Sequence, residues 1–326
     1  MEIRKVVDVE ALRAYHAVES AAYDHDFVAL PADPFEELLP LLGAEVEAGD
    51  LTLLYVGTDG GLPVGTLSLR LPTLDNLSNA ALDLTVHPDH RRRGHGRRLL
   101  QAGIAEVRAR GRSRIHLQVP SHSDGSDPQA LVLMTEAGAR PVLREDRRLL
   151  DLRRQAVGEP VPAPQGYRVV QWVDHVPDAL VDGAAHLMGR MILDAPMGDM
   201  DYEQEKWDAA RYRDKEQATV ARNRTCLGTA VVHAGTGAVA GITDIGVNRD
   251  HPRVAYQWNT IVDPDHRGRG LGMVLKSWNH RLLAERVPEA EFVNTWNASS
   301  NTFMVGVNDA LGFEVVERWT EWQLDL

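Results

Sequence analysis

The sequence contains a single cysteine, Cys226, and no long run of apolar residues. One cysteine excludes an intramolecular disulfide and a cysteine-rich metal site. Cys226 stands in an apolar stretch, where we expect a buried thiol with a structural role. No apolar run approaches the ~20 residues that a membrane span requires, and residues 1–8 lack a secretory signal. We therefore expect a cytoplasmic protein without a membrane partner.

Positive charge is in the minority. The chain has 35 lysines and arginines against 47 aspartates and glutamates, for a net charge of −12. A field of this sign repels a phosphate backbone, so we expect no nucleic-acid partner. It mildly favours cationic acceptors such as amines.

The feature that organises the chain is an internal repeat. Residues 86–96 read VHPDHRRRGHG, and residues 262–272 read VDPDHRGRGLG. The two copies are separated by the length of a whole domain, far more than the ~20–50 residues of a solenoid repeat. The repeat therefore indicates a duplicated domain.

A proline-rich segment separates the copies. Residues 153–166 carry three prolines at alternating positions with a glycine on each side, which is typical of an extended linker. We therefore predict two domains, residues 1–152 and 167–326, each near the usual length of ~150 residues.

The two halves share one order of predicted elements. In each half a strand and a helix come first, and strands around glycines follow. Next come a strand, the repeated motif, an amphipathic helix, and a final strand, helix and strand. This order predicts an α/β (or α+β) sheet fold in each half. The strand before the motif and the helix after it are 80–86 and 96–110 in the first half, and 255–262 and 272–285 in the second.

The second copy of the motif has the chemistry of a phosphate-binding loop. A glycine-rich turn between a strand and a helix leaves backbone N–H groups free at the positive end of the helix dipole. Glycine lets the phosphates approach the backbone, and two arginines can add charge-assisted hydrogen bonds. The dinucleotide and Walker patterns do not fit the spacing. The predicted pyrophosphate site consists of Arg267, Gly268, Arg269, Gly270, Leu271 and Gly272.

Arg-x-x-Gly-x-Gly after a Val-x-Pro turn resembles the acyl-CoA loop of the GCN5-related N-acetyltransferase (GNAT) superfamily. Residues 294–313, which end in Leu-Gly-Phe, resemble the downstream half of that fold. The resemblance spans most of 167–326 and is firm in the first half over about 80–140. The two-domain layout also resembles mycothiol synthase, although no motif ties the acceptor to that enzyme.

The resemblance implies two tandem GNAT-like domains, each a bent mixed β-sheet flanked by helices. It implies that the fourth and fifth strands splay apart and that acetyl-CoA, the co-substrate, lies between them. The backbone N–H of Ile261 or Val262 would stabilise the charge on the thioester oxygen. Asn301 falls where the superfamily places an asparagine that bonds the CoA arm. Asn308 falls where many members place a proton-donating tyrosine, and asparagine cannot supply a titratable proton.

The first domain departs further from the pattern. Asp127 stands opposite Asn301, and Met134 stands opposite Asn308. We therefore expect a degenerate first domain with a mainly structural role, and catalysis in the second.

Three sets of residues are candidates for handling the acceptor. Asp244 is the first candidate for a general base, with an outward-facing carboxylate as an equal alternative. Asn259 and Gln257 could orient the amine, or could be ordinary polar residues of the sheet. Asp194, Asp199 and Asp201 would suit a cationic acceptor, although acids in such a loop are more often solvent-facing turn residues.

These observations predict a reaction and leave two alternatives open. The leading hypothesis is transfer of an acetyl group from acetyl-CoA to a primary amine of a small molecule, by direct attack in the C-terminal domain. The alternatives are a protein-lysine acetyltransferase and a non-catalytic acyl-CoA sensor, which the residues Met134 and Asn308 motivate. No metal-ligand spacing occurs, so we expect no metal.

Overall fold

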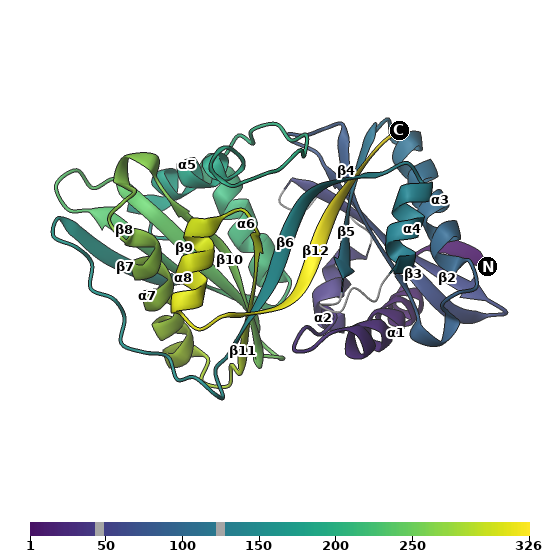
Figure 1. The fold of residues 1–326 in the computed structure, drawn as a ribbon, viewed down its shortest axis with the longest axis horizontal. Helices are drawn as coiled ribbons and strands as arrows, with labels where there is room; N and C mark the ends of the chain where they lie inside the picture. Colours follow the sequence, from purple (N-terminus) through teal and green to yellow (C-terminus); the bar gives the residue numbers. More distant parts are fainter. Residues whose placement is uncertain (43–48, 122–127) are drawn as a thin grey trace. The chain divides into compact units, whose positions relative to one another are not determined.

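The computed structural model describes residues 1–42, 49–121 and 128–326 (Figure 1). The chain forms two compact units. Unit 1 comprises Met1–Glu145, Gly198–Glu203 and Glu317–Leu326, and unit 2 comprises Asp146–Met197 and Gln204–Val316. No helix within the described ranges is long and apolar enough to cross a membrane.

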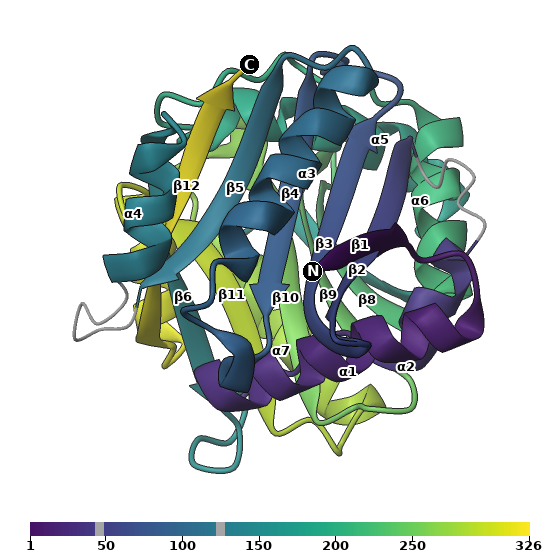
Figure 2. The ribbon, with the colours of Figure 1, turned by 90° about the vertical axis from the view of Figure 1, so that its right-hand side faces the viewer.

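Unit 1 is a mixed sheet with the strand order β1-β2-β3-β4-β5-β12. Its helices and several of its strands are seen in Figure 2. The elements are β1 (Glu2–Lys5), α1 (Val9–Asp26), α2 (Phe35–Leu38), β2 (Asp50–Asp59), β3 (Leu62–Pro72), β4 (Asn79–Val86), α3 (His95–Ala109), β5 (Arg114–Ser121), α4 (Pro128–Glu136), the first half of β6 (Arg140–Asp151) and most of β12 (Glu314–Asp325).

Unit 2 repeats this plan, with the strand order β6-β11-β10-β9-β8-β7. Its elements are the second half of β6, β7 (Tyr167–Val173), α5 (Asp178–Asp194), α6 (Ala209–Ala221), β8 (Arg224–His233), β9 (Val239–Asn248), β10 (Val254–Val262), α7 (Leu271–Arg286), β11 (Phe292–Ala298) and α8 (Thr302–Ala310). The predicted α/β class, with a mixed sheet flanked by helices in each half, is confirmed.

Each sheet buries apolar side chains on both faces. Leu53 of β2 packs in one cluster with Leu99 of α3, while its neighbour Leu54 packs with Leu12 of α1. Val231 of β8 likewise packs with Leu275 of α7, and Val232 belongs to the cluster under α5. Successive residues of a strand point to opposite faces, so these near-continuous apolar strands require helices on both sides.

The last strand of the chain completes the sheet of unit 1. Residues 318–325 of β12 pair antiparallel with residues 114–121 of β5, and Trp322 joins the core around Leu117. The predicted boundaries at 152 and 167 follow the repeat, whereas the units interleave along the chain. A repeated motif locates the duplicated domains but contains no information about which sheet a terminal strand completes.

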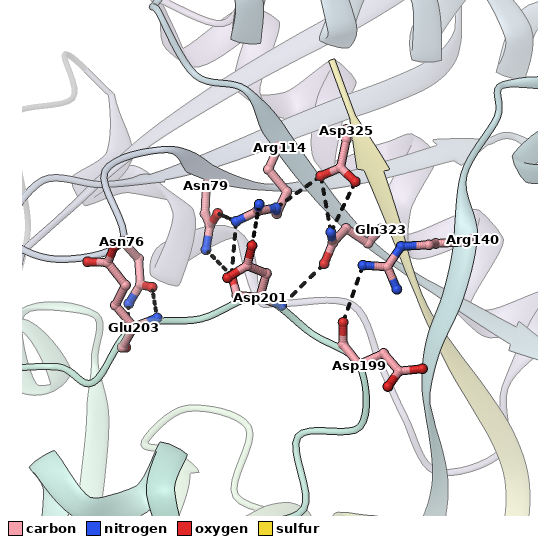
Figure 3. A network of polar contacts seen from close by, with 9 residues as sticks. All are labelled: Asn76, Asn79, Arg114, Arg140, Asp199, Asp201, Glu203, Gln323 and Asp325. Carbon is pink, nitrogen blue, oxygen red and sulfur yellow. Dashed lines mark hydrogen bonds and ion pairs between the residues drawn. The ribbon is translucent and has the colours of Figure 1, made fainter.

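The segment Gly198–Glu203 also belongs to unit 1 (Figure 3). The Asp201 carboxylate forms an ion pair with Arg114, and the Asn79 Nδ2 donates to the Asp201 carbonyl at 3.1 Å. The Glu203 N–H donates to Asn76 Oδ1 at 2.7 Å. Polar contacts thus hold this loop along its length.

Each unit contains a pair of parallel strands, β4 with β5 in unit 1 and β10 with β11 in unit 2. The two strands of each pair are hydrogen-bonded at one end only and then diverge, which we call the fork. Strand β10 pairs with β11 only from Val254 to Tyr256, and β4 pairs with β5 only from Asn79 to Ala81. Beyond Tyr256, β10 stays paired with β9, with a register shift between Gln257 and Thr260. One edge of β10 is therefore released from the β11 ladder just before the glycine-rich loop.

Candidate functional site

The glycine-rich loop of unit 2 joins the end of β10 to the N-terminus of α7. Gly268 and Gly270 have φ values of 76° and 72°, in the left-handed region that glycine adopts most readily. A Cβ added at either glycine would meet nothing within 4 Å. No described residue accepts a hydrogen bond from the backbone N–H groups of 268–272. The loop therefore presents free donors and open space at the positive end of a helix.

The first copy of the loop has nearly the same shape. Gly94 has a φ of 81°, and Arg92 adopts a φ of 66° where the second copy has Gly268. A non-glycine residue in this conformation costs roughly 1–2 kcal/mol. Unit 1 thus keeps the shape of the turn at a cost in conformational free energy, and it places the Arg92 side chain beside the turn.

The loop arginines contact the protein itself. The Arg267 Nε donates to the Val262 carbonyl at 3.1 Å, and its Nη2 lies 3.2 Å from an Asp194 carboxylate oxygen. The Arg269 guanidinium donates to the carbonyls of Asp265 and Arg267. These contacts fix the shape of the loop, a role that the spacing of the motif did not reveal.

The alternation of peptide groups distinguishes Ile261 from Val262. The Asp263 N–H donates to the Ala240 carbonyl of β9 at 2.9 Å. Successive peptides of a strand point to opposite neighbours, so the Ile261 N–H also faces β9 and the Val262 N–H faces the fork. Of the two predicted donors, only Val262 has its N–H on the side where β11 has diverged.

Asp244 is a buried carboxylate held by three donors, which neither of its two predicted roles anticipated. Its Oδ1 accepts from the Asn259 N–H at 2.8 Å, and its Oδ2 accepts from Lys215 Nζ at 2.9 Å and more distantly from Asn259 Nδ2. Burial alone lowers the pKa of Lys215, but the adjacent Asp244 charge outweighs burial and raises it.

The two amides near Asp244 differ in exposure. Gln257 is buried, and its Nε2 donates to Thr243 Oγ1 at 2.9 Å and to the Asp244 carbonyl at 2.8 Å. Asn259 is half-buried at the register shift of β10. Gln257 therefore braces the sheet, and Asn259 is the member of the predicted pair with an accessible side chain.

The two asparagines of the closing helix make structural contacts. Asn301 caps α8 by accepting from the Met304 N–H at 3.2 Å. Asn308 is fully buried, accepts from Lys276 Nζ at 2.6 Å and donates to Asn297 Oδ1.

Comparisons with known proteins bear on the fold and the type of protein. Residues 15–128 match the Acetyltransferase (GNAT) family. The mycothiol acetyltransferase of Salinispora arenicola is 29% identical over 291 residues, covering 89% of this chain and 85% of that protein. The corresponding protein of Salinispora tropica is 29% identical over 97% of this chain and 91% of its own length.

Solved structures give the same result. A tandem GNAT protein from the clavulanic acid biosynthesis pathway superposes with a TM-score of 0.84 at 28% identity, covering 99% of this chain and 98% of that one. A GNAT from Sphaerobacter thermophilus shares the fold, with a TM-score of 0.71 at 18% identity. Over nearly its whole length the chain is similar to tandem GNAT acetyltransferases. GNAT acetyltransferases use acyl-CoA as their co-substrate.

The acids predicted to bind a cationic acceptor belong to different units and are paired within them. Asp194 lies in unit 2 and pairs with Arg190 and Arg267, whereas Asp201 lies in unit 1 and pairs with Arg114. The backbone N–H of Asp199 donates to the Val142 carbonyl at 2.9 Å.

Unit 1 contains perturbed acids that the sequence analysis missed. Burial raises the pKa of Glu19 to about 7 against hydrogen bonds from Thr66 and Thr85, and burial raises the pKa of Glu321 to about 7 as well. Desolvation also raises the pKa of Asp83. These acids come from α1, β12 and β4, far apart in sequence, so no local pattern marked them.

The two residues of the first half that were aligned with Asn308 and Asn301 are Met134 and Asp127. Met134 is buried in the core, and Asp127 lies outside the described residues.

A cavity of about 230 Å³ lies elsewhere in unit 2, beneath the proline-rich linker. It is lined by linker residues and by Met273, Ser277 and His280 of α7, and none of the predicted site residues contributes to it. Within the described ranges, no group of three or more His, Cys, Asp or Glu residues could hold a metal ion.

Lys276 of α7 is the least expected charged residue of the site region. Its side chain is buried against Asn308 and the Phe313 ring. Burial, and secondly the Arg148 charge, lower its pKa to about 7. A lysine in an amphipathic helix is ordinarily exposed, so its position carried no signal for burial.

Substitution of Lys276 should change how stability depends on pH. Between pH 7 and the usual lysine pKa of 10.5 the unfolded chain holds a proton that the folded chain lacks. The free energy of unfolding therefore rises with pH across this window, by the order of a few kcal/mol. We expect Lys276→Met to remove this rise, measured by urea unfolding at several pH values.

Exposed Lys5 on β1 provides the control, because Lys5→Met should leave the pH dependence unchanged. An identical rise in the wild-type protein and in Lys276→Met would show that the lysine keeps its ordinary pKa in the fold.

Proposed function

We propose that this protein transfers an acetyl group from acetyl-CoA to a primary amine of a small molecule, and that unit 2 carries out the transfer. The observation that carries this proposal is the conjunction of free loop N–H groups with the open edge of β10. Two relatives named mycothiol acetyltransferase support a small-molecule substrate. The net charge of −12 favours a cationic one.

In this proposal the N–H groups of 268–272 and the α7 dipole bind the pyrophosphate. The glycines fit such a group, since nothing lies within 4 Å of the place where a Cβ would stand at Gly268 or Gly270. The pantetheine arm pairs with the edge of β10 in the fork. The Val262 N–H then donates to the thioester oxygen and stabilises its developing negative charge.

The reaction is a direct transfer between two bound substrates. The amine nitrogen attacks the thioester carbon, a C–N bond forms, and the C–S bond breaks to release the CoA thiolate. The nitrogen loses one proton and the thiolate gains one. Asn308 has no titratable proton to give, so a water molecule donates the proton that the thiolate gains. Holding both substrates in the fork supplies much of the rate.

We assign Asp244 a positioning role instead of the predicted role of general base. Its carboxylate holds the Asn259 N–H and Lys215, so it fixes the shift in β10 that leads to Val262. The amine proton passes to water beside Asn259.

A second candidate places catalysis in unit 1. The raised pKa values of Glu19, Asp83 and Glu321 favour it, because such shifts gather at functional sites. The family match to residues 15–128 also falls there.

Two further assays separate the small-molecule acceptor from a protein acceptor and from a sensor. Acetylation of a lysine peptide in preference to small amines would indicate a protein-lysine acetyltransferase. Acetyl-CoA binding without thiol release, for any amine or lysine peptide, would indicate a non-catalytic sensor.

Matched glycine substitutions distinguish the two loops. Gly270 and Gly94 both have positive φ and open space around them, so alanine causes similar strain at each. We expect Gly270→Ala to weaken acetyl-CoA binding about tenfold or more, because its Cβ obstructs the phosphates, and Gly94→Ala to leave binding unchanged. Calorimetric titration gives the affinities, and thiol release with a panel of amines gives the activity. The opposite pattern, with binding lost only in Gly94→Ala, would move the site to unit 1.

The Asp244 assignment predicts a loss of stability without a change in the pH profile. Asp244→Asn leaves the Lys215 charge without its counter-ion, so the free energy of unfolding should fall by about 2 kcal/mol. The acidic limb of kcat/KM against pH should keep its midpoint, measured below the unfolding temperature. Loss of that limb with unchanged stability would make Asp244 the general base after all.

A further inference from the structure

The last residue of α5, Asp194, contacts the arginine that opens the phosphate-binding loop. Its carboxylate accepts two hydrogen bonds from Arg190, at 3.0 and 3.2 Å, and lies 3.2 Å from Arg267 Nη2. The side chain of Asp194 is 12% exposed, so solvent screens these contacts only partly.

This location is electrostatically unfavourable for a carboxylate by itself. The C-terminus of a helix carries partial negative charge, which favours a cation there. The two arginines offset that repulsion. An aspartate at this position is therefore explained by an interaction outside α5, and Arg267 provides that interaction.

Unit 1 contains the same arrangement with different neighbouring sequence. Asp26 is the last residue of α1, and Arg91 donates to both of its carboxylate oxygens, at 2.8 and 2.6 Å. Burial tends to raise the pKa of Asp26, but the bonds from Arg91 outweigh it and lower the pKa. The Arg91 Nε also donates to Val86, as the Arg267 Nε does to Val262. The contact between the last residue of the helix and the first arginine of the loop thus occurs in both copies of the loop.

The contact holds one end of a segment that contains two glycines. The loop contains Gly268 and Gly270, and glycine allows the backbone many conformations. Through its side chain, Arg267 ties the end of β10 to the end of α5 immediately before these glycines. This anchor adds to the contacts of Arg269 that fix the shape of the loop in front of the N–H groups of 268–272.

We propose that Asp194 is a positioning residue for the CoA pyrophosphate and acts through Arg267. This inference rests on the proposed function, since it assumes that the loop of unit 2 binds acetyl-CoA. It gives Asp194 a role on the co-substrate side in place of its predicted role toward a cationic acceptor.

The test compares acetyl-CoA with S-acetylpantetheine, which has the thioester but no pyrophosphate. We expect Asp194→Asn to raise the Kd for acetyl-CoA about tenfold and to leave kcat/KM for S-acetylpantetheine unchanged. Asp194→Glu, which keeps the charge, should recover part of the affinity. Asp26→Asn is the matched control in unit 1 and should change neither value.

A double-mutant cycle tests the dependence on Arg267. If Asp194 acts through this arginine, Asp194→Asn should add nothing to the effect of Arg267→Gln on acetyl-CoA binding. Thermal unfolding of each variant shows that it is folded at the assay temperature.

Equal losses with both thioesters, additive effects in the cycle, or an unchanged Kd for acetyl-CoA would each overturn the inference. Failure of the unsubstituted protein to bind acetyl-CoA would instead overturn the proposed function, so the two failures are distinguishable.

Discussion

The separation of β10 from β11 after Tyr256 is the constraint on which the site depends. A strand that leaves its parallel neighbour keeps one edge of peptide groups free, and free peptide groups in a fold need a partner. In unit 2 this edge leads directly into a loop whose N–H groups have no described partner. In the proposed function, this one interruption in the ladder supplies donors for an extended arm and then for a phosphate.

The two units show which features of this arrangement are independent of one another. The fork, the turn and the Asp–Arg contact occur in both. The position of the carboxylate differs between the units. In unit 2 the carboxylate is Asp244 on β9, and Asn259 on β10 contacts it. In unit 1 the carboxylate is Asp83 on β4, and Ser68 on β3 is its partner in the ladder. Asp244 is neutralised by Lys215, whereas Asp83 has a raised pKa. The two units therefore share the loop and differ in the paired residues on the two strands before it.

Local patterns in the sequence predicted local structure well. The glycines of the repeat and the Pro-Asp turn fix the loop, and the alternation of β10 fixes its strand. The contacts that define the site join distant residues, such as Arg267 with Asp194 and Asp244 with Lys215. Their pairing depends on how α5 and α6 pack on the sheet, which no spacing records. The same reason explains why the burial of Lys276 and the place of β12 beside β5 were not predicted.

Hydrogen exchange with and without saturating acetyl-CoA tests the central claim most directly, because the claim concerns backbone N–H groups. The account predicts slower exchange for the amides of 268–273 and of Val262, with no change for 92–97 of the first loop. Protection confined to 92–97 would contradict it, and would place the acetyl-CoA site in unit 1.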